Sequence, residues 1–299
     1  MAVQISIKNI MNNRSFMFLK EEKANIIRIK ERGGVRLTID FGTETVNLAI
    51  HGRVATIELN RPDSLNALSV EMLKDLASVL KKAASVDEID IVVLTGKGRA
   101  FCSGGDIKTM LSSTDKSAFP LVMDSISTVV KELYCMPKLT ISAISGAAAG
   151  LGLSLALATD FLIAEKSSKI AMNFIGIALI PDGAAHYFLE KRLGEDKAKH
   201  LIWEGKPLAA DEAYKLGIIH EVAEEELSSI VDKKICTWLR SPIKAMLETK
   251  KIYMEKNLPE LNKVLELEKA GQYKMTQTQD HQEGIQAFIE KRKPVFIGK

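Results

Sequence analysis

Two glycine-rich segments carry most of the chemical information in this chain, residues 100–107 (AFCSGGDI) and residues 144–152 (ISGAAAGLG). Each follows an apolar, strand-like run and turns on glycine into a helical pattern. Each can therefore present backbone N–H groups with no side chain in the way. Two such turns can hold one oxygen atom from two sides, as the donors of an oxyanion hole do. A tight turn or close helix packing explains either segment alone, but the pair favours an oxyanion hole.

Strand and helix patterns alternate around these two segments. Residues 45–59 alternate apolar and polar side chains about a turn at His51 and Gly52, which predicts a β-hairpin. Ser69 then precedes a stretch with one apolar helical face, in the position of an N-cap. Further strands are expected at 91–95, 139–144 and 161–164, and helices at 107–111, 119–134 and 150–158. This order predicts an α/β fold with parallel strands and right-handed crossovers.

The two ends of the chain differ from this middle part. Residues 1–44 mix basic and acidic side chains without the apolar core of a secretion signal, which indicates an extension outside the folded core, disordered or not native. From Pro207 onward the pattern is mostly helical, with breaks expected at Pro242 and Pro259.

Composition excludes several classes of protein. The 299 residues are 46% hydrophobic and 26% charged with a net charge of +3, and no basic block is interleaved with aromatic residues. Nucleic acid is therefore not an expected partner. A membrane is not expected either, because no apolar run is long enough to span one. The three cysteines are few and widely spaced, which favours a reducing compartment over disulfides or a zinc site. We expect a cytoplasmic protein without a bound metal.

A series of motifs in a fixed order resembles the crotonase (enoyl-CoA hydratase/isomerase) superfamily from about Thr45 to Lys299. Besides the two glycine segments, the motifs are Leu59-Asn60-Arg61-Pro62, Asn66-Ala67-Leu68, Ala158-Thr159-Asp160, Leu179-Ile180-Pro181-Asp182-Gly183, Glu283-Gly284 through Phe288, and Lys291-Arg292-Lys293-Pro294. The resemblance implies a spiral of ββα units over residues 45–205 and a helical trimerisation region over 206–299. It also implies a homotrimer or homohexamer.

By the same resemblance, the N–H groups of Gly105 and Leu151 hold the carbonyl oxygen of an acyl-CoA thioester. Removing a proton beside that carbonyl puts negative charge on its oxygen, which is where such donors are needed. Coenzyme A belongs to the substrate, so no separate cofactor is expected. The residues implied to contact it are Ala100, Cys102, Gly104, Asp106, Ile107, Phe288 and Lys291.

The carboxylates of this chain do not match those of hydratases in the family. Those enzymes carry two glutamates, and their positions correspond here to Ser154 and Phe174. Ser154 is interpreted as a satisfied core hydroxyl, because an unactivated hydroxyl is a poor proton acceptor. Asp182 follows the proline at the place where isomerase-like members carry a single acidic base. It is either that base or the N-cap of the helix that follows.

His186 lies one helical turn after Asp182 and is a possible second proton carrier, although a lone histidine is more often packed or on the surface. The preferred interpretation is an enzyme that shifts a double bond in an enoyl-CoA through a thioester enolate. Two alternatives stay open: an enoyl-CoA hydratase with an atypical site, and a family member that binds acyl-CoA without turnover.

Overall fold

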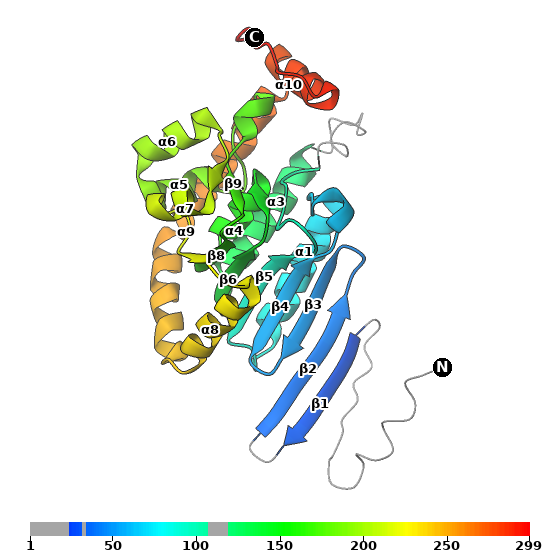
Figure 1. Cartoon of the computed structure of the whole chain (residues 1–299), viewed down its shortest axis with the longest axis vertical. Helices are drawn as coiled ribbons and strands as arrows, with labels where there is room; N and C mark the ends of the chain where they lie inside the picture. Colours follow the sequence, from blue (N-terminus) through cyan, green and yellow to red (C-terminus); the bar gives the residue numbers. More distant parts are fainter. Residues whose placement is uncertain (1–23, 32–33, 107–118) are drawn as a thin grey trace, which may run out of the picture.

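The computed structural model describes residues 24–31, 34–106 and 119–299 (Figure 1). Its main sheet has the strand order β1-β2-β3-β4-β5-β6-β8-β11. The antiparallel half consists of β1 (Ala24–Glu31), β2 (Gly34–Gly42), β3 (Val46–His51) and β4 (Val54–Leu59). The parallel half adds β5 (Ile91–Gly96), β6 (Leu139–Ile144), β8 (Phe161–Glu165) and β11 (Glu221–Ala223). The predicted hairpin and the three predicted parallel strands are confirmed.

The central parallel strands β5, β6 and β8 are largely buried on both faces, as their apolar runs indicate. On β5, Val92 and Leu94 point into the larger core, which α1 (Val70–Ser85) and α3 (Phe119–Tyr134) cover. Ile91 and Val93 point into a second core under α8 (Leu227–Leu239). The Ser69 hydroxyl caps α1 by accepting from the N–H of Met72, as the sequence predicts.

A second, three-stranded sheet was not predicted from the sequence. Its order is β10-β9-β7, with β7 at Ala147–Ala149, β9 at Lys169–Ala171 and β10 at Leu208–Ala209. These strands are only two or three residues long, too short to show an alternation of apolar and polar side chains. The small sheet matters for function because β7 lies within the second glycine-rich segment.

Helices make up most of the chain after residue 184. They are α5 (Ala185–Leu193), α6 (Glu195–Glu204), α7 (Ala210–Leu216), α8, α9 (Ile243–Met275) and α10 (Gln279–Glu290). The expected break at Pro259 is wrong, because this proline lies inside α9. Its side chain is exposed, so water can reach the carbonyl that loses its N–H partner, while buried Leu261 and Leu265 hold the next turn against the core.

Strands β1 and β2 lie in the segment for which the sequence indicates an extension. They lengthen the sheet at its edge, and β2 pairs with β3 from Thr38 to Gly42 (Figure 1). The domain boundaries themselves stay predictions. The helix expected at 107–111 falls outside the described residues. Within the described ranges, no helix is both long and apolar enough to cross a bilayer.

Candidate active site

The two glycine-rich segments lie side by side. A parallel bridge joins Cys102 to Ala148: the Cys102 N–H donates to the Ala147 carbonyl at 3.0 Å, and its carbonyl accepts from the Ala149 N–H at 3.0 Å. The Phe101 N–H adds a bond of 2.6 Å to the Ser145 carbonyl. Segments that are some 45 residues apart in the sequence are thus held together by backbone hydrogen bonds.

Gly104 brings the first turn against the second. A Cβ atom at this position would lie 2.9 Å from the Ala149 carbonyl oxygen and 3.6 Å from the Leu151 nitrogen, and its φ of +103° suits only glycine. Leu151 is the first residue of α4 (Leu151–Leu157), after Gly150 at a φ of +51°. The first turn therefore reaches the N-terminal end of α4, where N–H groups have no partner inside the helix.

The N–H groups of Gly105 and Leu151 are available to a ligand. The bonds from Leu68 N to Gly104 O (2.8 Å) and from Asp106 N to Leu68 O (3.1 Å) fix the peptide on either side of Gly105. The Gly104 carbonyl and the Gly105 N–H belong to one trans peptide and point in opposite directions, so the Gly105 N–H faces away from Leu68. Among the described residues neither this N–H nor that of Leu151 has an acceptor. The two predicted donors therefore lie on adjoining turns.

Close packing of these turns gives a stability prediction at Gly152. A Cβ there would lie 2.5 Å from the carbonyl oxygen and 2.7 Å from the Cβ of Cys102. We expect Gly152→Ala to lower the free energy of unfolding by about 1–3 kcal/mol, as overpacking does. Gly105→Ala is the control, because its new methyl group would meet no atom of the described residues within 4 Å and its φ is not positive. Urea unfolding of both variants measures the difference, and equal stabilities would contradict the packing argument.

The described residues predicted to contact coenzyme A near the first turn are buried or partly buried. Ala100 and Cys102 are fully buried, and the Cys102 thiol lies 3.5 Å from the Gly104 N–H. Burial raises the pKa of this thiol to about 12. Asp106 pairs with Arg61 at 3.0 Å. Ile107 lies outside the described residues, and the contacts of these residues with coenzyme A stay predictions.

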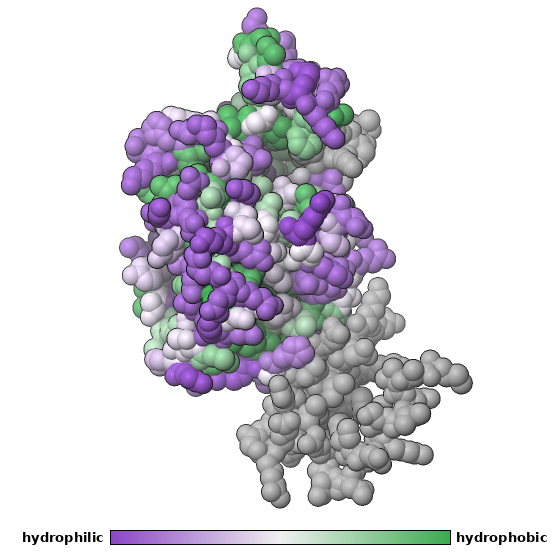
Figure 2. All heavy atoms as spheres, in the orientation of Figure 1, coloured by the Kyte–Doolittle hydropathy of each residue, from purple (hydrophilic) through white to green (hydrophobic). Residues whose placement is uncertain are grey.

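The other two residues predicted to contact coenzyme A, Phe288 and Lys291, lie far from the glycine turns in the sequence, at the C-terminal end of α10. Phe288 is 58% exposed, and Lys291 ends the helix in the left-handed conformation. Figure 2 shows apolar surface at this end of the molecule, among hydrophilic side chains. In the described part of the chain, neither residue forms a hydrogen bond or ion pair with the glycine turns.

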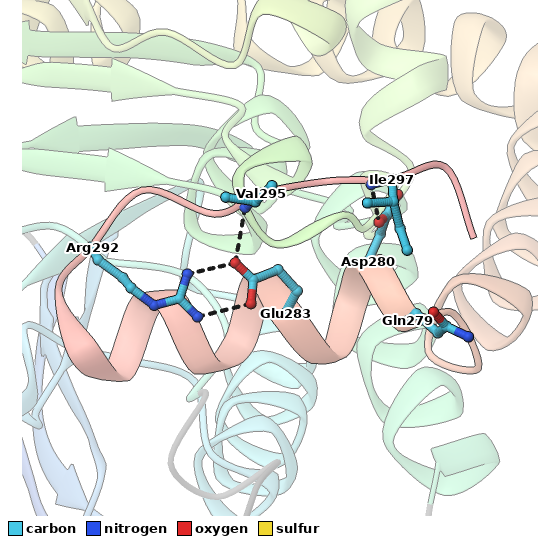
Figure 3. A pocket seen from close by; sticks show the side chains of 6 residues that line it. All are labelled: Gln279, Asp280, Glu283, Arg292, Val295 and Ile297. Carbon is cyan, nitrogen blue, oxygen red and sulfur yellow. Dashed lines mark hydrogen bonds and ion pairs between the residues drawn. The ribbon is translucent and has the colours of Figure 1, made fainter.

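A pocket of about 440 Å³ lies between α10 and the C-terminal tail. Figure 3 shows Arg292 paired with both oxygens of Glu283, which also accepts from the N–H of Val295. Asp280 holds the N–H of Ile297 in the same way. The charged groups of this pocket are thus used to fold the tail back onto α10, and none of the glycine-turn residues lines it.

The loop that carries Asp182 lies against the first turns of α4. The Ser154 hydroxyl donates to the Asp182 carbonyl at 2.8 Å, and a Cβ on Gly183 would lie 2.7 Å from a methyl group of Leu151. The interpretation of Ser154 as a satisfied core hydroxyl is confirmed. It has a positional effect as well, because it fixes the backbone of Asp182 beside the helix that begins with Leu151.

Asp182 is only 8% exposed as a residue, and its two carboxyl oxygens differ in their partners. Gln272 of α9 donates to Oδ2 at 3.3 Å, whereas Oδ1 is buried without a partner among the described residues. Burial, followed by the charge of Glu268, raises the pKa of Asp182 from 3.8 to about 8, against a smaller opposing effect of the Gln272 hydrogen bond. Oδ1 is therefore the oxygen with a free lone pair.

Asp182 does not cap the helix that follows it, so that alternative is wrong. Helix α5 begins at Ala185 with Ala184 as its N-cap and no cap from its own segment. The carboxylate of Glu268 takes this place from α9: Oε2 accepts from the Ala184 N–H at 2.7 Å and Oε1 from the His186 N–H at 3.2 Å. Glu268 is only 2% exposed, and a buried carboxylate needs such partners. The N-terminus of α5 supplies them as N–H groups at the positive end of the helix dipole.

His186 completes this group of side chains. Its Nδ1 lies 2.7 Å from Oε1 of Glu268, and the ring is partly exposed. Because an ionised carboxylate only accepts hydrogen bonds, Nδ1 carries the proton and donates it. His186 thus contacts Glu268 directly, and the charge of Glu268 in turn acts on Asp182.

Sequence reasoning missed Glu268 and Gln272, although a signal for both is present. Residues 261, 265, 268 and 272 form one helical stripe, and all four are buried. The first two are leucines, and the next two are a glutamate and a glutamine. Buried polar side chains need partners. A carboxylate and an amide at core-facing positions of a helix therefore indicate a function for that face.

Phe174, at the second glutamate position of hydratases, begins the short 3₁₀ helix η3 (Phe174–Ile177). Its ring lies next to Gly150, since a Cβ on that glycine would be 3.6 Å from the ring. The first glutamate position thus holds the buried Ser154 hydroxyl, which is bound to a backbone carbonyl, and the second holds the apolar ring of Phe174. Neither can activate a water molecule as a carboxylate does.

Comparison with known proteins gives consistent matches over this region. A family model described as enoyl-CoA hydratase/isomerase matches residues 49–299. YhaR of Bacillus subtilis, provisionally named an enoyl-CoA hydratase/isomerase, is 50% identical over 253 residues, covering 85% of this chain and 99% of YhaR. The 1,2-epoxyphenylacetyl-CoA isomerase of Escherichia coli is 34% identical over 250 residues, covering 82% of this chain and 95% of that enzyme.

A solved structure agrees with the fold. An enoyl-CoA hydratase from Mycobacterium avium subsp. paratuberculosis superimposes with a TM-score of 0.78 at 30% identity, covering 86% of this chain and all of the other. The predicted crotonase-like spiral with a helical C-terminal region is thereby confirmed.

Proposed function

The chain belongs to the enoyl-CoA hydratase/isomerase family, and on that basis we propose that it shifts a carbon–carbon double bond in an enoyl-CoA thioester. Asp182 removes a proton from the carbon next to the thioester carbonyl. The electron pair moves onto the carbonyl oxygen, which accepts from the N–H groups of Gly105 and Leu151. Asp182 then returns the proton at the far end of the former double bond. The product is an isomer of the substrate, and no cofactor is consumed.

The observation that supports isomerisation best is the buried carboxyl group of Asp182 beside α4, with Oδ1 unpartnered among the described residues. The buried carboxylate of Glu268, by contrast, is occupied by backbone N–H groups at the start of α5. One carboxylate suffices for a proton that leaves one carbon and returns to another. Adding water to a double bond needs a second group to position the water. The two positions at which hydratases carry glutamates hold Ser154 and Phe174, which do not supply it. Relatives of similar identity are named as an isomerase of an epoxide and as a hydratase, so the proposal rests on the residues of the site.

A panel of thioesters tests the proposal. The purified protein is mixed with 2-enoyl-CoA and 3-enoyl-CoA of several chain lengths, and both isomerisation and hydration are followed. Turnover of 3-enoyl-CoA to the 2-enoyl isomer without a hydrated product is the expected result. Hydration as the main reaction would favour the atypical hydratase, and binding without turnover of any thioester would favour the non-catalytic alternative.

The raised pKa of Asp182 predicts the pH dependence of this reaction. The base must be ionised to accept a proton, so kcat/KM should fall as the pH drops below about 8 and level off above it. Rates measured between about pH 6 and 10 with subsaturating 3-enoyl-CoA give the midpoint for the free enzyme. A profile that stays flat down to pH 6 would contradict Asp182 as the base. The predicted trimer or hexamer and the cytoplasmic location stay predictions.

A further inference from the structure

Helix α9 approaches the Asp182 loop closely at one point. A Cβ on Gly271 would lie 2.4 Å from a methyl group of Ile180, so the glycine lets the helix contact this loop. Gln272 then reaches the loop twice, donating to the Ile180 carbonyl at 2.6 Å and to Oδ2 of Asp182 at 3.3 Å. One turn earlier, Glu268 binds the backbone of Ala184 and His186. The two polar residues of the α9 stripe therefore flank Asp182.

These two side chains have opposite electrostatic effects. The Glu268 carboxylate has its negative charge in a buried position, and a like charge disfavours ionisation of Asp182. Gln272 donates a hydrogen bond, which favours the ionised form. In the described part of the chain, the other groups around Asp182 are the neutral Ser154 hydroxyl on α4 and His186 on α5, whose ring binds Glu268. Lys269, the residue after Glu268 on α9, forms an ion pair with Asp124 of α3, whose carboxylate is exposed.

We propose that Glu268 and Gln272 are positioning residues for proton transfer by Asp182. Glu268 makes Asp182 hold its proton, and Gln272 fixes Oδ2 so that Oδ1 faces the reacting carbon. This inference rests on the proposed role of Asp182 as the base. The His186 ring is the third member: because it donates to Glu268, it keeps that carboxylate in place over the first turn of α5.

The arrangement matches what a proton shuttle requires. A base that must both take and return a proton works best when its pKa is near the working pH. Burial alone raises the pKa of Asp182, and the charge of Glu268 raises it further. Gln272 limits this effect. Glu268 and Gln272 together therefore tune the proton affinity of Asp182, although neither is proposed to contact the substrate.

The test measures the protonation of Asp182 directly. The infrared carbonyl band of its protonated carboxyl group is followed against pH and assigned by its absence in Asp182→Asn. Glu268→Gln should move the titration midpoint to lower pH by about one unit. Gln272→Met, which keeps a similar shape but removes the donor, should move it to higher pH. The pH midpoint of kcat/KM should shift in the same directions.

Two further variants separate charge from structure. Glu268→Asp keeps the charge while it disturbs the contacts with α5, so its midpoint should stay near that of the wild type. Glu266→Gln removes an exposed charge from the same helix and should leave the midpoint unchanged. The proposal is overturned if Glu268→Gln leaves the midpoint unchanged, or if Glu268→Asp shifts it as much as Glu268→Gln.

The infrared titration does not depend on turnover. If the protein fails to isomerise any enoyl-CoA, the midpoints still show whether Glu268 and Gln272 control Asp182. If it isomerises but the midpoints do not move, only the role of these two residues fails.

Discussion

Asp182→Asn should lower kcat/KM for 3-enoyl-CoA isomerisation by about 10²–10⁴-fold, the usual contribution of a positioned general base. Asparagine has nearly the same shape, and its side-chain oxygen can still accept the hydrogen bond that Gln272 donates to Oδ2. What it lacks is a basic oxygen at the position of Oδ1. Initial rates are best compared at about pH 9, where Asp182 of the wild type is ionised.

Stability measurements show whether such a loss reflects chemistry or misfolding. The pKa of Asp182 is raised in the folded protein, so its contribution to stability is present below the unfolded pKa of about 3.9 and is lost as the pH rises towards 8. Asparagine does not titrate. At pH 9 the variant should therefore melt at the same temperature as the wild type or higher.

A surface change of the same kind provides the activity control. Asp196 has a side chain that is 87% exposed, and Asp196→Asn should leave the rate unchanged. If Asp182→Asn keeps the full isomerase rate, Asp182 is not the base, and the chemistry must be assigned to another group.

Local sequence patterns predicted the elements around the site well. The β-branched run of β5 and the Ser69 cap of α1 each depend on residues within a few positions of one another. The glycine turns depend on a similar local property, because only glycine tolerates the conformation and close approach seen at Gly104. Such features can be predicted from a single sequence.

The features that sequence reasoning missed depend on distant contacts. Glu268 meets the start of α5 across 84 residues, and nothing near either segment indicates this contact. It arises because α9 continues through Pro259 instead of ending there. The path of α9 is decided by the burial of Leu261 and Leu265, a tertiary effect that outweighs the local cost of proline. The error at Pro259 and the missed half of the site thus have the same cause.

Leu151→Pro should lower kcat by about 10²–10³-fold relative to Leu151→Ala, the usual cost of losing one oxyanion donor. Leu151 is the first residue of α4, a position where proline fits a helix because the N–H there has no helical partner. Proline removes that N–H and leaves the rest of the helix backbone able to form. The substitution therefore targets the donor that the proposed enolate needs.

Leu151→Ala is the matched control because it keeps the N–H. Both variants lose the buried leucine side chain, so both should be destabilised by about 2–5 kcal/mol relative to the wild type, and urea unfolding measures this shared cost. The donor acts mainly on charge that develops in the reaction, so the further loss in the proline variant should appear in kcat and little in KM. Equal kcat values in two folded variants would mean that the Leu151 N–H does not bind the developing oxyanion.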